Sequence, residues 1–475
     1  MKLSVYSRIS KSLTAMAVLL ALAAVCRVAA ESRPNVVVIF TDDHRWDAVG
    51  ASRNSRIQTP NIDRLSENGL YLPNAFVTLS ICAPSRAALL TGRYGTHNGV
   101  VDMQTDLVIE EGTLAQRLGE AGYETSVFGK WHLKATPERL GFDYASTFYG
   151  LVPYWDVEFK RQGTEIATSG FVDDATTEEA VRYLERKRAE QPFFVWYNSF
   201  APHMDNQFAW PARAQTLDKY PKSNLPLPRT WEGELLGKPP YLSRSRPRLR
   251  ALEYGYAEAE SVLDHIQGYY ASVTDMDSAV GKLMDYLRHS GLADDTYVIL
   301  MGDNGWFNSE HGLTSKVLAY EESIRVPMIV AGPEVQKGVR DELVLNIDIM
   351  PTVLELAGLE ASDALQGRSL VPIMKGEPVS GWREYIYYEA PFPQHGTQPH
   401  LAVRTKEWKY IATYDDSSLQ ALQFEELYHL ESDPEEQHNL ASDITLKRIL
   451  FEMRAKLEEA RGRYTNPDRL LDSGK

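Results

Sequence analysis

The stretch from Cys82 to Arg93 places a cysteine, an arginine and the start of a helix close together. Pro84 suits the first turn of a helix, where its missing N–H is not needed, and Gly92 can end the helix. This helix would put the Cys82 thiol at the positive end of the helix dipole, which favours anions and a lowered thiol pKa. Arg86 lies four residues on and can share a face with Cys82. Together these groups favour chemistry on an oxyanion ester; the simpler alternative is a buried cysteine without a chemical role.

Four apolar, strand-like runs in the chain each end in a cluster of polar residues. The runs cover residues 35–40, 125–128, 192–200 and 296–301, and the clusters are Asp42 with Asp43, Lys130 with His132, His203, and Asp303 with Asn304. Ligands bind outside the carboxyl ends of the strands in open α/β sheets, so we expect these side chains to converge with Cys82. Carboxylate and amide oxygens suit a hard cation, although an isolated Asp pair more often caps a helix and a lone histidine is more often structural.

Three segments resemble the type I sulfatases, the formylglycine-dependent sulfatase family of the alkaline-phosphatase-like superfamily. Residues 82–93 follow the signature Cys-x-Pro-Ser-Arg-x-x-x-Leu-Thr-Gly-Arg, residues 129–132 match its Gly-Lys-Trp-His segment, and residues 201–203 match its Ala-Pro-His segment. The resemblance covers residues 34 to 430. It implies that a formylglycine-generating enzyme oxidises Cys82 to formylglycine and that the hydrated aldehyde is the nucleophile.

The resemblance also implies a role for each polar cluster. The implied metal ligands are Asp42, Asp43, Cys82, Asp303 and Asn304. Because oxygen ligands predominate, the expected ion is Ca²⁺, with Mg²⁺ as the alternative. Arg86, Lys130 and Lys316 would stabilise the charge on the transferring sulfuryl group. His203 and Lys316 are candidates to protonate the leaving alcohol, and His132 would take a proton from the second hydroxyl of the hydrate.

The elements that must position these residues predict an α/β fold. The resemblance implies an alkaline-phosphatase-like, mostly parallel mixed sheet sandwiched by helices. Residues 257–289 have the apolar spacing of a long helix, and residues 326–330 read as a last core strand. Short runs at 385–388, 401–404, 408–411 and 427–430, followed by a helix at 445–461, predict a small antiparallel sheet. We therefore expect a catalytic domain over residues 31–375 and a C-terminal subdomain over residues 376–475.

Residues 205–250 have many prolines and no persistent helical or strand period, which predicts an irregular excursion near the site. Four arginines alternate near its end: Arg244, Arg246, Arg248 and Arg250. They are either a subsite for an anionic glycan or a solvated basic loop.

The first 30 residues have the pattern of a secretory signal peptide, with a basic start, an apolar run and a small-residue end. Cys26 raises lipid anchoring as a minor alternative, and we expect no stable membrane insertion. The chain has two cysteines, so removal of the leader leaves Cys82 as the single thiol. The net charge of −15 disfavours nucleic acid as a partner. We expect an exported protein, periplasmic or extracellular.

The predicted function is that of a sulfuric ester hydrolase, a sulfatase that removes sulfate from a sulfated carbohydrate. One alternative keeps the fold and changes the ester, giving a phosphonate or phosphate ester hydrolase. Another is a secreted glycan-binding protein that kept the fold without activity. Nothing in the sequence indicates which sugar carries the ester or at which position.

Overall fold

The computed structural model describes residues 33–187, 191–233, 235–394 and 396–472, and the predicted leader with Cys26 lies outside these ranges. A large sheet forms the centre of the molecule. In spatial order its strands are β14 (Gly338–Val339), β2 (Leu70–Tyr71), β13 (Met328–Ala331), β9 (Thr296–Gly302), β1 (Asn35–Thr41), β8 (Phe193–Asn198), β4 (Glu124–Trp131), β5 (Tyr144–Tyr149), β6 (Glu158–Arg161) and β7 (Thr164–Ala167). The five strands from β9 to β5 run parallel, and antiparallel pairs extend both edges, which confirms the predicted mixed sheet.

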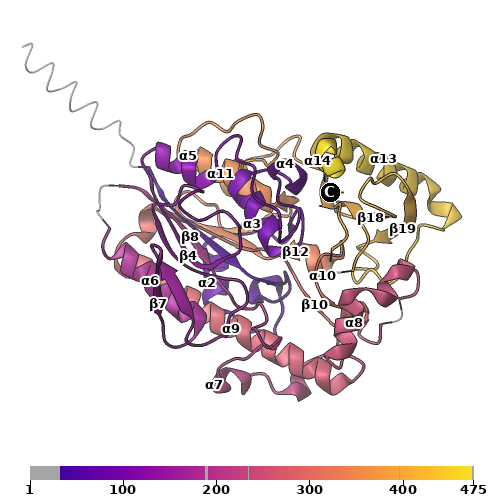
Figure 1. Cartoon of the computed structure of the whole chain (residues 1–475), viewed down its shortest axis with the longest axis horizontal. Helices are drawn as coiled ribbons and strands as arrows, with labels where there is room; N and C mark the ends of the chain where they lie inside the picture. The colour runs from indigo at the N-terminus through magenta and orange to yellow at the C-terminus, as the bar shows by residue number, and fades with distance from the viewer. Residues whose placement is uncertain (1–32, 188–190, 234, 395, 473–475) are drawn as a thin grey trace, which may run out of the picture.

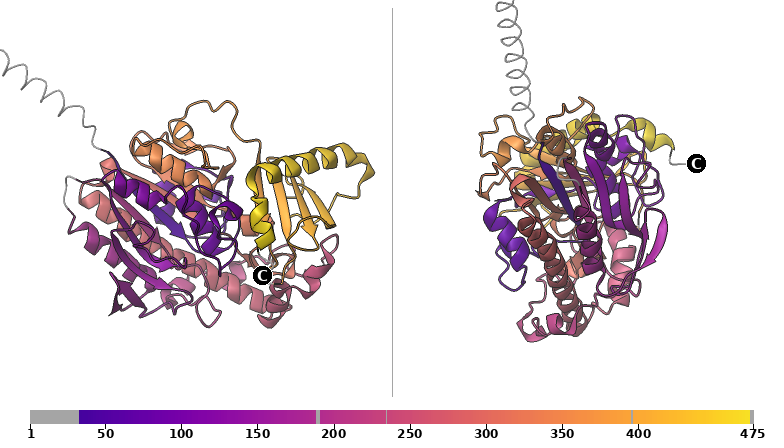
Figure 2. Two further views of the ribbon diagram at one scale, coloured as in Figure 1. Left: turned by 45° about the horizontal axis from the view of Figure 1, so that its top comes forward. Right: turned by 90° about the vertical axis from the view of Figure 1, so that its left-hand side faces the viewer.

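The side chains of β1 alternate between the two faces of this sheet, as a pleated strand requires. Val36, Val38 and Phe40 belong to one hydrophobic cluster, and Val37 and Ile39 belong to another. On the first face lie α3 (Cys82–Thr91), α5 (Leu114–Glu120), α11 (Ile349–Leu356) and α12 (Val371–Met374); on the second lie α2 (Pro60–Asn68), α6 (Val172–Leu184) and α9 (Ala259–His289). The sheet is therefore sandwiched by helices, as Figures 1 and 2 show.

A smaller antiparallel sheet follows, with strands in chain order: β16 (Tyr385–Ala390), β17 (His400–Thr405), β18 (Trp408–Tyr414) and β19 (Leu422–His429). Helix α13 (Lys447–Tyr464) lies along it, before α14 (Pro467–Asp472) (Figure 2). Apolar residues of this sheet share a cluster with Leu79, Ile81 and Ala88 around the start of α3. Glu389 adds a polar link, because its carboxylate accepts hydrogen bonds from the backbone N–H and the hydroxyl of Thr96 in α4 (Gly95–Asn98) and from the hydroxyl of Thr465.

Two sequence predictions differ from the structure. The expected strand at 326–330 is two strands, β12 (Arg325–Val326) and β13, because Pro327 interrupts it and β12 pairs instead with β3 (Ala75–Phe76). The expected irregular segment at 205–250 ends in helix α8 (Arg246–Glu253). Ser245 caps this helix by accepting a hydrogen bond from the Arg248 N–H, and Pro247 lies in its first turn.

The remaining elements are short. They are η1 (Gly50–Ser52), α7 (Ala214–Leu217), η2 (Lys222–Asn224), η3 (Pro240–Arg244), η4 (Ala293–Asp295), β10 (Phe307–Asn308), η5 (Glu310–Gly312), β11 (Thr314–Ser315), α10 (Glu321–Ile324), β15 (Val344–Leu345), η6 (Asn346–Asp348) and η7 (Ile444–Leu446). Within the described ranges, none of the helices combines the length and apolar character needed to cross a membrane.

Candidate functional site

The carboxyl ends of β1 and β9 bring together two pairs of oxygen-bearing side chains. These strands are paired in register to their last residues, so Asp42 and Asp43 lie beside Asp303 and Asn304. The Asp43 backbone N–H donates to Asp303 Oδ1 at 3.1 Å, and Asn304 Nδ2 donates to Asp43 Oδ1 at 2.5 Å. All four residues are buried. The predicted convergence of these two clusters is therefore present in the structure.

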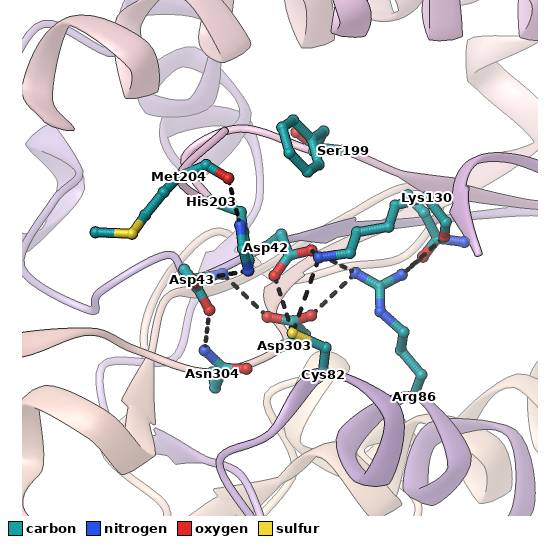
Figure 3. Close-up of polar contacts among 12 residues, drawn as sticks. Asp42, Asp43, Cys82, Arg86, Lys130, Ser199, His203, Met204, Asp303 and Asn304 are labelled. Atoms are coloured by element: carbon teal, nitrogen blue, oxygen red, sulfur yellow. Dashed lines mark hydrogen bonds and ion pairs between the residues drawn. The ribbon is translucent and has the colours of Figure 1, made fainter. Parts of the chain in front are cut away.

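Helix α3 delivers Cys82 to the same group of residues. The helix begins at Cys82 and ends at Gly92, which has a φ of 62°, in agreement with the sequence prediction. The Cys82 Sγ lies 3.3 Å from Asp42 Oδ1 and 2.9 Å from Lys316 Nζ. Figure 3 shows Cys82 in the first turn of α3, directed at the carboxylates that follow β1 and β9. The Cys82 thiol thus links the start of α3 to the polar side chains at the carboxyl edge of the large sheet.

Two lysines place ammonium groups around Cys82. Lys130, near the end of β4, forms an ion pair with Asp42, and its Nζ lies 4.0 Å from Cys82 Sγ. Lys316 forms an ion pair with Asp43 and donates to Asn304 Oδ1 at 3.2 Å. Both lysines are buried. Two positively charged side chains therefore lie next to the side chain of residue 82.

Arg86 is fixed one helical turn beyond Cys82, as the four-residue spacing predicts. Its Nη2 lies 2.9 Å from Asp303 Oδ2 and 3.4 Å from Asp42 Oδ2. Its Nη1 donates to Asn198 Oδ1 at 2.8 Å. With only 1% of the residue exposed, the guanidinium is held in one orientation beside the carboxylates.

His203 reaches the cluster from the segment that follows β8. Its Nε2 lies 3.5 Å from Asp43 Oδ2, and its Nδ1 lies 2.6 Å from the carbonyl oxygen of Met204. His132 lies at the margin: its ring meets the Tyr149 ring edge-on with centroids 5.5 Å apart, and its buried Nδ1 has no hydrogen-bond partner in the described part of the chain. His132 therefore lies farther from the carboxylates than His203 does, and no hydrogen bond joins it to Cys82 within the described ranges.

Sequence reasoning missed two residues that position the site. Asn198, the last residue of β8, orients Arg86. A polar residue at the carboxyl end of a core strand was a usable signal. Asp173 in α6 accepts hydrogen bonds from the backbone N–H groups of Phe200 and Ala201 at 2.8 and 3.1 Å, and so holds the turn before His203. No local sequence signal distinguishes this aspartate from an ordinary acidic residue in the first turn of a helix.

Burial and neighbouring charges set the pKa values of the cluster. Burial opposes charge on Asp42, but Lys130, His203 and Arg86 hold its pKa well below the usual range. Burial and the proximity of Asp42 raise the pKa of Asp303 to about 7. Burial and the charge on Lys130 lower the pKa of both His132 and His203. Each of these imidazoles therefore holds a proton less readily than a free histidine.

The sequence prediction of a lowered pKa for the Cys82 thiol is wrong. Burial of the thiol and the nearby Asp42 carboxylate raise its pKa above the usual value, despite the opposing effects of Lys130 and Lys316. The helix dipole is a smaller influence than complete burial beside a carboxylate. Cys82 as an unmodified thiol is therefore a poor nucleophile at this position.

The donor set at this edge fits a hard divalent cation. Within the described ranges, ligand atoms of Asp42, Asp43, Cys82 and His203 lie within 4.8 Å of one another. The buried Asp43 Oδ2 accepts no hydrogen bond from any described residue. Asn304 adds an amide oxygen, which accepts a hydrogen bond from Lys316, the lysine that also pairs with Asp43. The chemistry of the oxygen donors thus suits an ion such as Ca²⁺ or Mg²⁺ better than one that prefers sulfur or several imidazoles.

A cavity of about 650 Å³ is lined by residues from the end of β4, the segment after it, and strands β5 to β7. Trp131, Leu133 and Tyr149, which surround His132 in sequence or space, are among the residues that line it. Asp42, Asp43, Asp303 and Cys82 are not among the residues that line it. His311, the remaining histidine of interest, packs against Tyr320 with ring centroids 5.3 Å apart and so braces the loop before Lys316.

Comparison with known proteins gives consistent results from residue 34 to residue 463. The sulfatase family model matches residues 34–359, and the model described as N-sulphoglucosamine sulphohydrolase, C-terminal, matches residues 309–463. The chain is 29% identical to an N-acetylglucosamine-6-O-sulfatase of Bacteroides thetaiotaomicron, over 92% of this chain and 88% of that protein. It is 30% identical to an ulvan-active sulfatase of Formosa agariphila, over 90% of this chain and 81% of that protein.

A solved structure also superposes on this fold. It is the structure of a protein in complex with its substrate D-glucosamine-2-N,6-O-disulfate, and it aligns with a TM-score of 0.83 and 26% sequence identity. The alignment covers 93% of this chain and 100% of that chain. The similarity includes both the large sheet and the C-terminal sheet.

Proposed function

The chain belongs to the sulfatase family, and we propose that it removes sulfate from a sulfated carbohydrate by using formylglycine made from Cys82. The observation that carries this proposal is the position of Cys82, whose Sγ lies within 4.0 Å of Asp42, Lys130 and Lys316 at the start of a buried helix. The carbohydrate substrate is supported by the relatives, one of which acts on N-acetylglucosamine 6-O-sulfate and another on ulvan by name.

Formylglycine would supply what the buried thiol lacks. Its hydrate offers one hydroxyl to attack sulfur and a second hydroxyl whose deprotonation allows sulfate to leave and the aldehyde to return. The signature Cys82-Ala83-Pro84-Ser85-Arg86 supports the need for a formylglycine-generating enzyme as a maturation partner. A serine or an unmodified cysteine has no second hydroxyl and would stop after the first transfer.

We assign the cation ligands to Asp42, Asp43, Asp303 and Asn304, together with residue 82. The support is the burial of these four oxygen-bearing side chains side by side, and the Asp43 Oδ2 atom, which accepts no hydrogen bond from the described residues. Ca²⁺ is the preferred ion and Mg²⁺ the alternative, because both favour oxygen ligands. A bound divalent cation would supply a positive charge that draws a sulfate oxygen to the site and lowers the pKa of a neighbouring hydroxyl.

The cationic side chains have the right placement to bind the sulfate group. Arg86 is held rigid by Asp303 and Asn198, so its charge needs no reorganisation during the reaction. Lys130 and Lys316 flank residue 82 and would stabilise charge on the transferring sulfuryl group. Burial strengthens each of these interactions because the local dielectric constant is low.

Proton transfer falls to three side chains. His132 is neutral near pH 7 and has a free buried nitrogen, which suits it to accept the proton of the second hydroxyl. His203 and Lys316 are the candidates to protonate the leaving alcohol. Lys316 carries a proton throughout the neutral range, because the carboxylates of Asp43 and its neighbours outweigh burial and raise its pKa.

The amino-terminal pattern supports export of the protein to the periplasm or beyond the cell. The deciding experiment is parallel measurement of sulfate and phosphate release from sulfated and phosphorylated sugars, with protein co-produced with a formylglycine-generating enzyme. We expect sulfate release that Cys82→Ala abolishes. Faster release of phosphate would assign the chain to the phosphorus ester hydrolases. No release of either, with peptide mass showing unmodified Cys82 in protein from the native host, would favour a glycan-binding protein.

A further inference from the structure

The arginines of α8 lie on two different faces of the helix. In a helix each residue turns about 100°, so Arg246 and Arg250 share a face while Arg248 points the other way. Arg248 Nη1 donates to the carbonyl oxygen of Gly312 at 2.8 Å and so ties α8 to the loop before Lys316. Arg248 is therefore a structural residue, and the sequence pattern of four equivalent arginines does not hold.

The face that carries Arg250 also carries an aromatic surface. The Arg250 guanidinium lies over the Phe208 ring, with its central carbon 4.9 Å from the ring centroid. Phe208 is 41% exposed and has a φ of 60°, a costly conformation for a bulky residue that directs the ring at α8. In the described part of the chain, no carboxylate lies within ion-pair distance of Arg250. The guanidinium is thus stacked but not neutralised.

This surface is directly connected to the catalytic cluster. Tyr254, one turn beyond Arg250, contacts Met204 through its hydroxyl, 3.8 Å from Sδ. The Met204 carbonyl oxygen lies 2.6 Å from His203 Nδ1. Residues 203 to 208 therefore carry His203 at one end and Phe208 at the other. Figure 1 shows α8 between the long helix α9 and the C-terminal sheet.

The net charge of the protein is negative, whereas Arg246 and Arg250 place two positive charges close together. The chain has a net charge of −15, so an anionic polymer is repelled unless cations are concentrated near the site. Burial and the positive charge of Arg250 lower the pKa of Arg246, so the two guanidinium groups lie close enough to interact, and Arg246 is an exposed residue. Guanidinium groups bind sulfate and carboxylate oxygens through paired hydrogen bonds, and an adjacent aromatic ring offers a flat apolar surface.

We propose that Arg246 and Arg250, with the Phe208 ring, form a subsite for a second anionic group of the substrate, on the sugar next to the one that loses sulfate. This proposal rests on the proposed function, because it takes the Cys82 cluster as the reacting position. The second group is a sulfate or a carboxylate, since a guanidinium pair recognises the oxygens of both. The preferred substrate is then an oligosaccharide with more than one negative charge.

The test measures binding to Cys82→Ala protein by calorimetry, so that turnover does not interfere. The probes are a disulfated disaccharide whose second sugar is a sulfated uronate, the same disaccharide with its carboxylate reduced to an alcohol, and a monosulfated monosaccharide. The test variant adds Arg246→Ser and Arg250→Ser. The matched control adds Arg56→Ser and Arg448→Ser, which remove the same charge from two exposed positions elsewhere. Phe208→Ala is a second, independent variant.

We expect the test variant to bind the uronate disaccharide about tenfold more weakly than the control, and the monosaccharide within twofold of it. If the test variant also binds the reduced disaccharide more weakly than the control does, the second group is a sulfate. If the two variants bind the reduced disaccharide equally well, the second group is the carboxylate. Phe208→Ala should weaken the disaccharides only. Equal weakening of all three probes, or of none, contradicts the subsite. Failure of every probe to bind folded Cys82→Ala protein contradicts the carbohydrate substrate itself.

Discussion

Replacement of Glu389 by glutamine should change how the stability of the protein depends on pH. Glu389 lies at the end of β16, is 0% exposed and accepts hydrogen bonds from Thr96 and Thr465. Burial raises its pKa from the ordinary 4.5 to about 7, against the effect of those hydrogen bonds. The folded protein therefore binds a proton that the unfolded chain has already lost between these two pH values.

The sign and size of the effect follow from this shift. A raised pKa means that stability is fully present below pH 4.5 and is lost as the pH rises towards 7. The whole shift corresponds to about 3 kcal/mol. About 2.5 kcal/mol of it falls between pH 5 and pH 8, because the unfolded chain is already partly ionised at pH 5. Glu389→Gln carries no titrating group and removes this contribution.

The assay is urea denaturation of both proteins at pH 5 and pH 8. The free energy of unfolding of Glu389→Gln minus that of the wild type should be about 2.5 kcal/mol higher at pH 8 than at pH 5, so the variant gains stability relative to the wild type as the pH rises. Glu452→Gln is the matched control, since Glu452 is half-exposed on α13 and should leave the pH dependence unchanged. Parallel pH profiles for wild type and Glu389→Gln would refute the raised pKa.

Three predictions concern the reaction. Cys82→Ser should lower kcat by at least about 10³-fold and leave sulfate on the introduced hydroxyl, detectable as added mass on that peptide; near-native kcat would contradict the proposed nucleophile. His203→Ala and Lys316→Ala should each be compared on a sugar sulfate and on 4-nitrophenyl sulfate. For the variant that lacks the general acid, kcat should fall about 10²- to 10⁴-fold on the sugar sulfate but much less on the nitrophenyl ester, because the nitrophenolate leaving group needs no proton. An equal fall in kcat on both esters would exclude that role. Chelation should abolish sulfate release, and titration with Ca²⁺ or Mg²⁺ should restore it, with Zn²⁺ ineffective; full activity in metal-free protein would contradict the ligand assignment.

Much of the fold follows from local patterns in the sequence. The core strands are runs of β-branched residues that end in polar clusters, and the parallel pairing of β1 with β8 and β9 brings those ends to one edge. This is why Asp42, Asp303 and His203 meet as predicted, although they are far apart in the chain. Helix α3 also agrees to its first residue, because proline and glycine mark its two ends.

Other features depend on tertiary surroundings that no short segment contains. The pKa of Cys82 is set by burial beside Asp42, which outweighs the helix dipole that the sequence indicates. Asp173 supports the His203 turn from α6, a helix that comes before β8 in the chain. Helix α8 was predictable in principle, because Ser245 and Pro247 are start signals, but the surrounding prolines obscured them.

The burial of α3 has a consequence for the order of events in the life of the chain. All ten residues of this helix are buried, including Cys82 and Arg86. A maturation enzyme that recognises this segment has no access to it once the sheet and the C-terminal strands have packed. Under the proposed maturation, conversion of Cys82 and folding would compete in time, and a chain that folds first would keep its thiol. The share of active molecules would then depend on which of the two processes is faster.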